Sequence, residues 1–159
     1  MIRLLVVACA ACGGDLDAPL DPLTLDAPFF ACRVQPVLTK YCSALACHGA
    51  DGRYFHVFAR NRARLTGDET QRNAFLSDAE RAHNFDAARA LIDPSAPTDS
   101  VLVLKPLEQA AGGYFHVGAT LYGRGNVFAT RDDDDYQTLV QWATGSTEDP
   151  TCQEPGSTL

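Results

Sequence analysis

The sequence predicts a small, mainly α-helical domain with long loops. Three stretches repeat apolar residues at the spacing of one helix face, and no stretch keeps the apolar–polar alternation of a half-buried strand. The 159 residues suffice for one hydrophobic core but are few for two domains. The formal net charge of -7 makes nucleic acids and anionic lipid surfaces poor partners.

The first predicted helix brings the chain to Cys42. Pro36 is tolerated in the first turn of a helix, so we expect this helix to begin near Gln35. Its apolar face is formed by residues that recur at helical spacing, namely Val34, Val37, Leu38 and Tyr41.

Two further helices are indicated by the signals at their ends. Ser77 and Glu80 have the spacing of a capping box, and Pro94 ends the helix that they begin. Near the C-terminus, the aspartates 132–135 suit the positive end of a helix dipole, and Gly145 is a typical stop for the helix that follows them.

The region between these two helices is expected to be mostly loop. Residues 100–107 form an apolar piece suited to one or two helical turns, and residues 112–125 are rich in glycine. Ligand contacts concentrate in loops, which makes the glycine-rich segment a candidate binding region.

The N-terminus is similar to a bacterial lipoprotein signal. A short positive start precedes an apolar run, residues 4–8, that is too short to span a bilayer. Small residues then lead to Cys12, which we expect to be the lipidated first residue after a signal peptide at residues 1–11. The mature chain is then periplasmic or on the cell surface, and reaches the membrane only through a lipid anchor. Cys9 is an alternative lipidation site, and a plain secretory signal is an alternative to both.

Residues 12–28 are predicted to be a tether between the lipidated cysteine and a domain over residues 29–159. Aspartates alternate here with prolines, a composition that disfavours helix and favours extended chain. Three leucines leave open the alternative that part of the tether packs as an N-terminal arm, namely Leu20, Leu23 and Leu25.

The segment from Cys42 to His48 is typical of covalent haem attachment. A c-type haem needs two thiols that add across its vinyl groups and an imidazole beside the second thiol that ligates the iron. Cys42, Cys47 and His48 supply these groups, although four residues rather than the usual C-x-x-C-H spacing separate the cysteines. The longer loop must arch outward. We expect one covalent haem c, with His48 as the proximal iron ligand.

Two other interpretations of the same residues stay open. Cys42 and Cys47 can form a local disulfide, with His48 an ordinary surface histidine. They can also supply two sulfurs to a zinc site completed by His48 or His56. Structural zinc sites usually combine two short ligand pairs, and the sequence holds no second pair of that kind.

The remaining cysteines are then accounted for. If Cys9 leaves with the signal and Cys12 is acylated, Cys32 and Cys152 remain beside the haem cysteines, and we expect a disulfide between these two. Two ordinary disulfides would also use all the cysteines of the mature chain, so the count does not choose between the interpretations.

Over about residues 29–145 the chain resembles the cytochrome c-like domains of secreted bacterial proteins. Those domains often show V-x-P-I-L, a cysteine pair and His-Gly, which correspond here to residues 34–38 and 42–49. Their later halves often show P-x-x-S-x-L-x-x-K-P, His-x-Gly, an Asp-rich turn and a Tyr-x-x-Leu-x-x-Trp helix. The corresponding residues are Pro97, Ser100, Leu102, Lys105, Pro106, His116, Gly118, Asp132–Asp135 and Tyr136–Trp142. The resemblance implies a cytochrome c-like helical fold.

The second axial ligand of the iron cannot be methionine, because the single methionine is Met1 and leaves with the signal. His116 lies in the glycine-rich loop, the region that supplies the distal ligand in this fold, and is the expected distal ligand. His56, His83 and an open or water-ligated iron are the alternatives. Ligation by two imidazoles lowers the reduction potential relative to histidine and methionine.

Four arginines follow the haem motif in an otherwise acidic chain. One of them is suited to pair with a haem propionate, and the alternative is that they lie on a solvated helix face. They are Arg53, Arg60, Arg62 and Arg64.

We therefore expect a monohaem c-type cytochrome that passes single electrons between redox partner proteins of the cell envelope, and not a catalyst. One alternative is a haem-free surface lipoprotein, stabilised by disulfides, that acts as a binding or structural module. The other is an enzyme or gas sensor with a five-coordinate haem.

Overall fold

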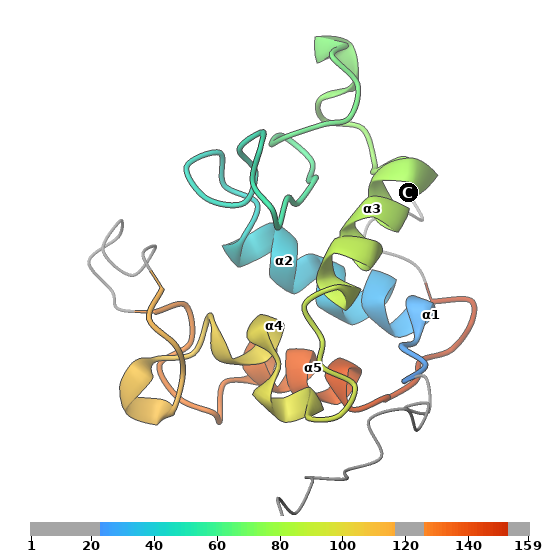
Figure 1. Ribbon diagram of the computed structural model, residues 1–159. Helices are drawn as coiled ribbons and strands as arrows, with labels where there is room; N and C mark the ends of the chain where they lie inside the picture. The colour runs from blue at the N-terminus through green and yellow to red at the C-terminus, as the bar shows by residue number, and fades with distance from the viewer. Residues whose placement is uncertain (1–22, 117–125, 153–159) are drawn as a thin grey trace, which may run out of the picture.

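The computed structural model describes residues 23–116 and 126–152 of the chain (Figure 1). The predicted signal peptide, the lipidation site Cys12 and most of the predicted tether lie outside these ranges. Within them, an isolated bridge between Leu107 and Phe128 is the only strand-like pairing, and no sheet forms. The structure confirms the mainly α class with long loops.

Six helical segments follow one another along the described part of the chain. They are α1 (Ala27–Phe29), a π turn (Phe30–Val34), α2 (Gln35–Tyr41), α3 (Asp78–Arg89), α4 (Val101–Leu104) and α5 (Asp134–Ala143). Short 3-10 turns lie in the loops at Glu69–Gln71, Pro97–Asp99 and Gln109–Ala111. None of the described helices is long and apolar enough to cross a membrane. In Figure 1, the long loop after α2 lies on one side of that helix, and α4 and α5 lie on the other.

The first helix is longer than the sequence predicted. α2 begins at Gln35 as expected, but it continues a helical run that starts at Ala27, where the Asp26 carboxylate accepts a hydrogen bond from Phe29. Pro36 has no N–H and would clash with the carbonyl four residues earlier in a regular α-helix. In the π turn immediately before α2, hydrogen bonds span five residues instead of four. The chain therefore accommodates Pro36 and the helical run continues.

The last residues of the predicted tether pack on the domain. Leu25 is buried in the core, Leu23 packs against that core, and the indole N–H of Trp142 donates to the Asp26 carbonyl at 3.0 Å. Residues 23–28 therefore form the N-terminal arm of the alternative interpretation. Packing Leu23 and Leu25 on the core stabilises this arm, whereas an extended tether would leave both side chains in water.

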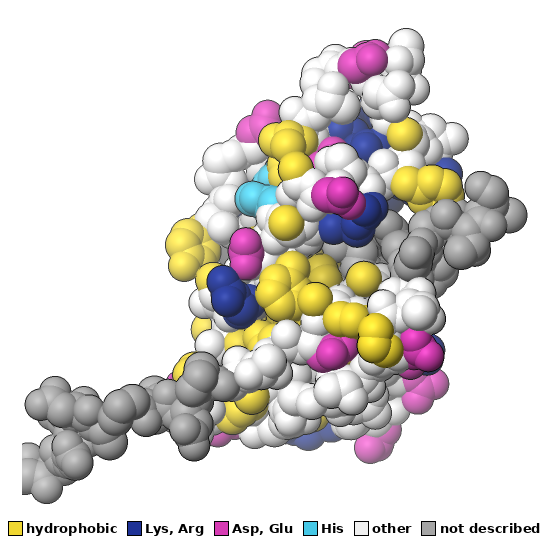
Figure 2. Space-filling model, turned by 90° about the vertical axis from the view of Figure 1, so that its right-hand side faces the viewer, with side chains coloured by type: hydrophobic (Ala, Val, Ile, Leu, Met, Phe, Trp, Pro, Cys, Tyr) yellow, Lys and Arg dark blue, Asp and Glu magenta, His cyan; other side chains and the backbone are white. Residues whose placement is uncertain are grey.

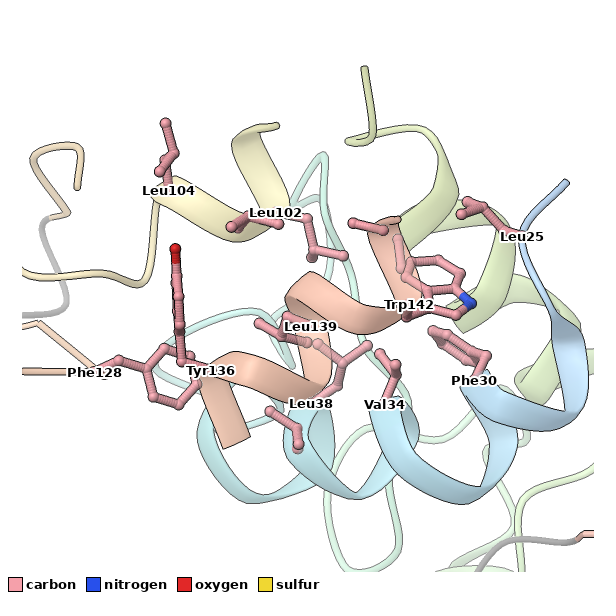
Figure 3. Packing of buried hydrophobic residues seen from close by; sticks show 14 of the residues in the cluster. Leu25, Phe30, Val34, Leu38, Leu102, Leu104, Phe128, Tyr136, Leu139 and Trp142 are labelled. Atoms are coloured by element: carbon pink, nitrogen blue, oxygen red, sulfur yellow. The ribbon is translucent and has the colours of Figure 1, made fainter. Parts of the chain in front are cut away.

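The core lies where the helical run crosses α5 (Figure 3). The Phe30 ring lies 5.1 Å from the fully buried Trp142 ring, and Val34 and Leu38 of the run face Leu139 of α5. Burying each such side chain contributes about 1.5–3 kcal/mol. This contact fixes the direction in which α2 presents its C-terminal end.

A disulfide between Cys32 and Cys152 joins the first helical run to the C-terminal segment, with Cα atoms 6.0 Å apart, as expected from the sequence. The two cysteines are 120 residues apart in the chain. In the chain-entropy model a closed loop of this length stabilises the fold by about 4–5 kcal/mol.

The long loop between α2 and α3 is held by a buried ion pair. The capping box of Ser77 and Glu80 begins α3 as predicted, and the Glu80 carboxylate also accepts two hydrogen bonds of 2.9 Å from Arg64. The Arg64 side chain is only 7% exposed and also donates to backbone carbonyls of residues 71–75. The alternative of a solvated helix face is thus wrong for Arg64, which lies outside the helices and is buried, because its planar fork of donors matches acceptors on both sides.

The Glu80 carboxylate titrates far below its usual range. Burial alone would raise its pKa, but hydrogen bonds from Arg64 and from the backbone N–H groups of Ser77 and Leu65 outweigh that effect and hold the pKa at about 2. The folded pKa is thus lower than the unfolded one. The ionised carboxylate therefore stabilises the fold above about pH 4.5, and this contribution is lost as the pH falls toward 2.

We expect Glu80→Gln to lower the free energy of unfolding by about 3–5 kcal/mol at pH 7, because it leaves the Arg64 charge buried without its partner. The variant should also lose most of the acid dependence of stability between about pH 4.5 and 2. Urea unfolding followed by circular dichroism, repeated at several pH values, measures both effects.

Glu69→Gln is the matched control, because it breaks an exposed ion pair, 3.3 Å from Arg72, in the same loop. Its cost should stay below about 0.5 kcal/mol. Equal losses in the two variants would contradict the role assigned to the buried pair.

Candidate functional site

The cysteine–histidine segment folds back onto the end of α2. Cys42 ends the helix, with its N–H bonded to the Leu38 carbonyl at 2.9 Å. The His48 N–H then donates to the Cys42 carbonyl at 3.0 Å, and the Cys47 N–H to Ala44 at 2.7 Å. Leu45 and Ala46, in the middle of the segment, are exposed, whereas Ser43 is buried and its hydroxyl donates to the Thr39 carbonyl of α2.

Glycine is needed directly after this turn. A Cβ atom on Gly49 would overlap the carbonyl oxygen of Ser43. Any side chain here would thus push the segment away from α2. The glycine that follows His48 in the sequence motif is thus required for steric reasons in this fold.

Both thiols of the segment are free. Cys42 and Cys47 are half-buried and are not bridged to each other, whereas Cys32 and Cys152 are. The Cys42 side chain packs against the hydrophobic core. Burial, with a smaller contribution from Cys47, raises the pKa of the Cys42 thiol to about 12. The Cys42 sulfur is therefore held as a neutral thiol at the end of α2.

The His48 ring is oriented by a backbone carbonyl. Its Nδ1 lies 2.9 Å from the carbonyl oxygen of Phe55, and a carbonyl can only accept, so Nδ1 carries the proton. The other ring nitrogen, Nε2, is left with a free lone pair. Metal-binding histidines use this arrangement, in which the second ring nitrogen is fixed by a hydrogen bond. The Phe55 ring, 4.9 Å away, packs beside the imidazole.

The structure brings the His116 ring next to the His48 ring, with the two ring planes nearly parallel. The two ring centroids are 6.0 Å apart and the ring planes differ by 14°. Nδ1 of His116 is buried and has no hydrogen-bond partner. Two imidazoles bound on opposite sides of one metal ion have centroids about 6 Å apart, because each metal–nitrogen bond is about 2.0–2.1 Å long.

Burial keeps both of these imidazoles neutral. It lowers the pKa of His48, against the bond to Phe55, and the positive charge of Arg53 lowers it further. Burial likewise lowers the pKa of His116, with added effects of His48 and Lys105. Neutral imidazole is the form that ligates a metal.

The loop that carries His116 is held by backbone contacts that the sequence did not reveal. The Tyr114 N–H donates to the Leu104 carbonyl at 2.8 Å, and a Cβ atom on Gly113 would overlap the carbonyl of Leu107. The buried Asn126 side chain donates to the carbonyls of Leu107 and Tyr114. The Gly-Gly pair before Tyr114 is a usable signal for this close approach, whereas nothing in the sequence singles out Asn126. Residues 117–125 of the same predicted loop lie outside the described ranges.

The rings of His56 and His83, the alternative distal ligands, lie near each other. Their ring centroids are 5.8 Å apart, and both rings contact Phe58. In the described part of the chain, no three histidine, cysteine or acidic side chains are grouped to hold a metal ion.

We expect the neutral His48 side chain to carry its proton on Nδ1, because the Phe55 carbonyl can only accept a hydrogen bond. Long-range ¹H–¹⁵N correlation spectra of the haem-free protein at pH 8 distinguish the two tautomers. Free histidine, which favours the Nε2–H form, is the reference. An Nε2–H tautomer of His48 would contradict the hydrogen bond.

Comparison of the chain with protein-family models, with curated proteins and with solved structures gives no match. What the site can do therefore has to follow from its own residues. Two thiols at a helix end and two facing neutral imidazoles are the groups it offers.

Proposed function

We propose that this chain binds one covalent haem c and carries single electrons as a c-type cytochrome of the bacterial cell envelope. The observation that carries the proposal is the facing pair of imidazoles, His48 and His116, next to two free thiols. When bound, haem c supplies an iron that changes its oxidation state by one electron.

The described residues fit such a group. Cys42 and Cys47 are the thiols for its two vinyl side chains, and His48 follows the second thiol with Nε2 free to bind iron. A buried ring nitrogen without a partner costs about 1–3 kcal/mol, and His116 has one. Metal ligation by the two imidazoles explains why the fold holds them in this arrangement.

Apolar side chains next to these ligands also support the proposal. Leu45, Tyr54 and Phe115 are 53%, 87% and 61% exposed, and each lies on a segment that carries one of the proposed haem contacts. Large apolar side chains exposed to water favour an apolar partner. The porphyrin ring is such a partner, and we propose that it covers part of this surface.

One basic side chain lies near each proposed ligand, namely Arg53 near His48 and Lys105 near His116. Of the four arginines after the motif, Arg64 is committed to Glu80, and Arg60 binds Asn73. Arg53 and Arg62 remain, and Arg53 is the one whose charge lies near a proposed ligand, so we assign Arg53 to a haem propionate.

The proposed location, in the periplasm or on the cell surface, rests on the predicted signal peptide at residues 1–11 and the predicted lipidation of Cys12. The disulfide between Cys32 and Cys152 is compatible with this location, because disulfides persist in oxidising compartments. The same disulfide is equally compatible with a haem-free surface lipoprotein. The proposed partners are redox proteins of the cell envelope, and the only membrane contact is the lipid anchor.

We expect the full chain to acquire one haem when it is produced in a host with haem-attachment machinery. The intact mass should then rise by one haem, and the spectrum should be low-spin in both oxidation states because two imidazoles bind the iron. The control is the variant in which Cys42→Ala and Cys47→Ala are combined, which should carry no covalent haem.

A colourless product, in a host that matures a control cytochrome, would contradict the proposal and leave the haem-free lipoprotein. A high-spin spectrum that shifts with carbon monoxide would favour the enzyme or sensor instead.

We expect His116→Ala to convert the iron from low-spin to high-spin while the covalent haem is retained, because this change removes the distal imidazole. The optical spectrum measures the change directly. His83→Ala is the matched control, since it removes an exposed histidine elsewhere, and its spectrum should stay low-spin. A low-spin His116→Ala variant would show that another group is the distal ligand.

A further inference from the structure

His56 is buried in a way that its protein contacts do not explain. Its side chain is only 12% exposed, and its Nε2 has no hydrogen-bond partner. Leaving a buried polar atom unpaired costs about 1–3 kcal/mol, so each such atom calls for a water molecule or an ion. The unpaired nitrogen is therefore a place to look for a ligand.

Two further donor groups surround this nitrogen. The His83 ring, on α3, lies 5.8 Å from the His56 ring, and an Asp51 carboxylate oxygen lies 3.9 Å from Nε2 of His56. Phe58 packs against both rings, at 4.6 and 4.9 Å, and forms an apolar wall. Histidine reaches the surface on the face shown in Figure 2, among hydrophobic and acidic side chains.

These separations suit the ligands of one metal ion. A 3.9 Å distance is too long for a hydrogen bond between Asp51 and His56. Two ligand atoms on one ion with bonds of about 2.0–2.1 Å lie about 3–4 Å apart, and two imidazole rings on one ion have centroids about 5–6 Å apart. Both separations around His56 agree with these values.

We propose that His56 and His83 form a second metal site, which binds one divalent transition-metal ion with Asp51 as a third ligand. Imidazole suits zinc, copper and nickel, and copper(II) binds most tightly to a given set of nitrogen and oxygen ligands. The described side chains do not yet form a complete group of three. Asp51 is fully exposed, and its carboxylate must move inward to complete the site.

A bound ion at this site connects two parts of the fold. His56 directly follows Phe55, whose carbonyl orients His48, and His83 belongs to α3. The ion would therefore fasten the loop that positions His48 to a rigid helix, and raise the thermal stability of the protein by selective binding to the folded state.

The test is a copper(II) titration of the full chain with Cys42→Ser and Cys47→Ser, followed by calorimetry and electron paramagnetic resonance. Thiols are removed because soft sulfur ligands select and stabilise copper(I). This background carries no covalent haem, so the result does not depend on the proposed cytochrome function. We expect one ion bound through imidazole nitrogen at this site, and a higher melting temperature.

Three single changes in that background locate the ion. His83→Gln, on an exposed position of α3, should abolish this binding, and Asp51→Asn should weaken it about tenfold or more. His116→Ala should leave it intact, because it affects only the other histidine pair. Circular dichroism confirms that each variant is folded.

The proposal is overturned if His83→Gln binds copper(II) as the background does. It is also overturned if His116→Ala alone removes the bound ion, because the metal then occupies the other histidine pair. The two proposals can fail separately. If the natural chain acquires no haem, but copper(II) binding is still lost only in His83→Gln, the cytochrome proposal is wrong and the second metal site stands.

Discussion

The packing of the first helical run against α5 determines where everything else lies. The Trp142 ring is fully buried, contacts the Phe30 and Phe85 rings, and binds the Asp26 carbonyl through its indole N–H. One side chain thus ties the N-terminal arm, the helical run and α3 to α5. Because the run is fixed along its length, its end at Cys42 is fixed as well.

The two facing histidines are placed by loops rather than by regular structure. Each loop approaches a neighbouring backbone so closely that only glycine fits, at Gly49 and at Gly113. A backbone carbonyl orients His48, and hydrogen bonds from Asn126 hold the chain before His116. Such contacts hold these loops in place although their described residues form no α-helix or sheet. The reason is that a buried carbonyl or N–H group costs free energy when its hydrogen bond is broken.

The tetrapeptide Tyr-Phe-His-Val occurs at residues 54–57 and 114–117, and its two copies have different environments. Phe55 is 9% exposed and its carbonyl serves His48, whereas Phe115 is 61% exposed. The histidines differ as well, since His56 pairs with His83 and His116 with His48. Identical local sequence therefore does not imply an identical role, because the neighbours of each copy come from distant parts of the chain.

Local sequence determined the mainly helical class, the capping box of α3 and the aspartate-rich start of α5, because helix periodicity and end signals act over a few residues. It also indicated the bond between Cys32 and Cys152, through the accounting of the cysteines. The extension of the first helix to Ala27 and the burial of Arg64 were not predictable in this way, since the first needs a π turn before Pro36 and the second depends on how the loop folds back onto Glu80. The resemblance to cytochrome c-like domains predicted His116 opposite His48, but only the tertiary structure brought these two rings together, because their distance depends on how two long loops pack against the ends of helices.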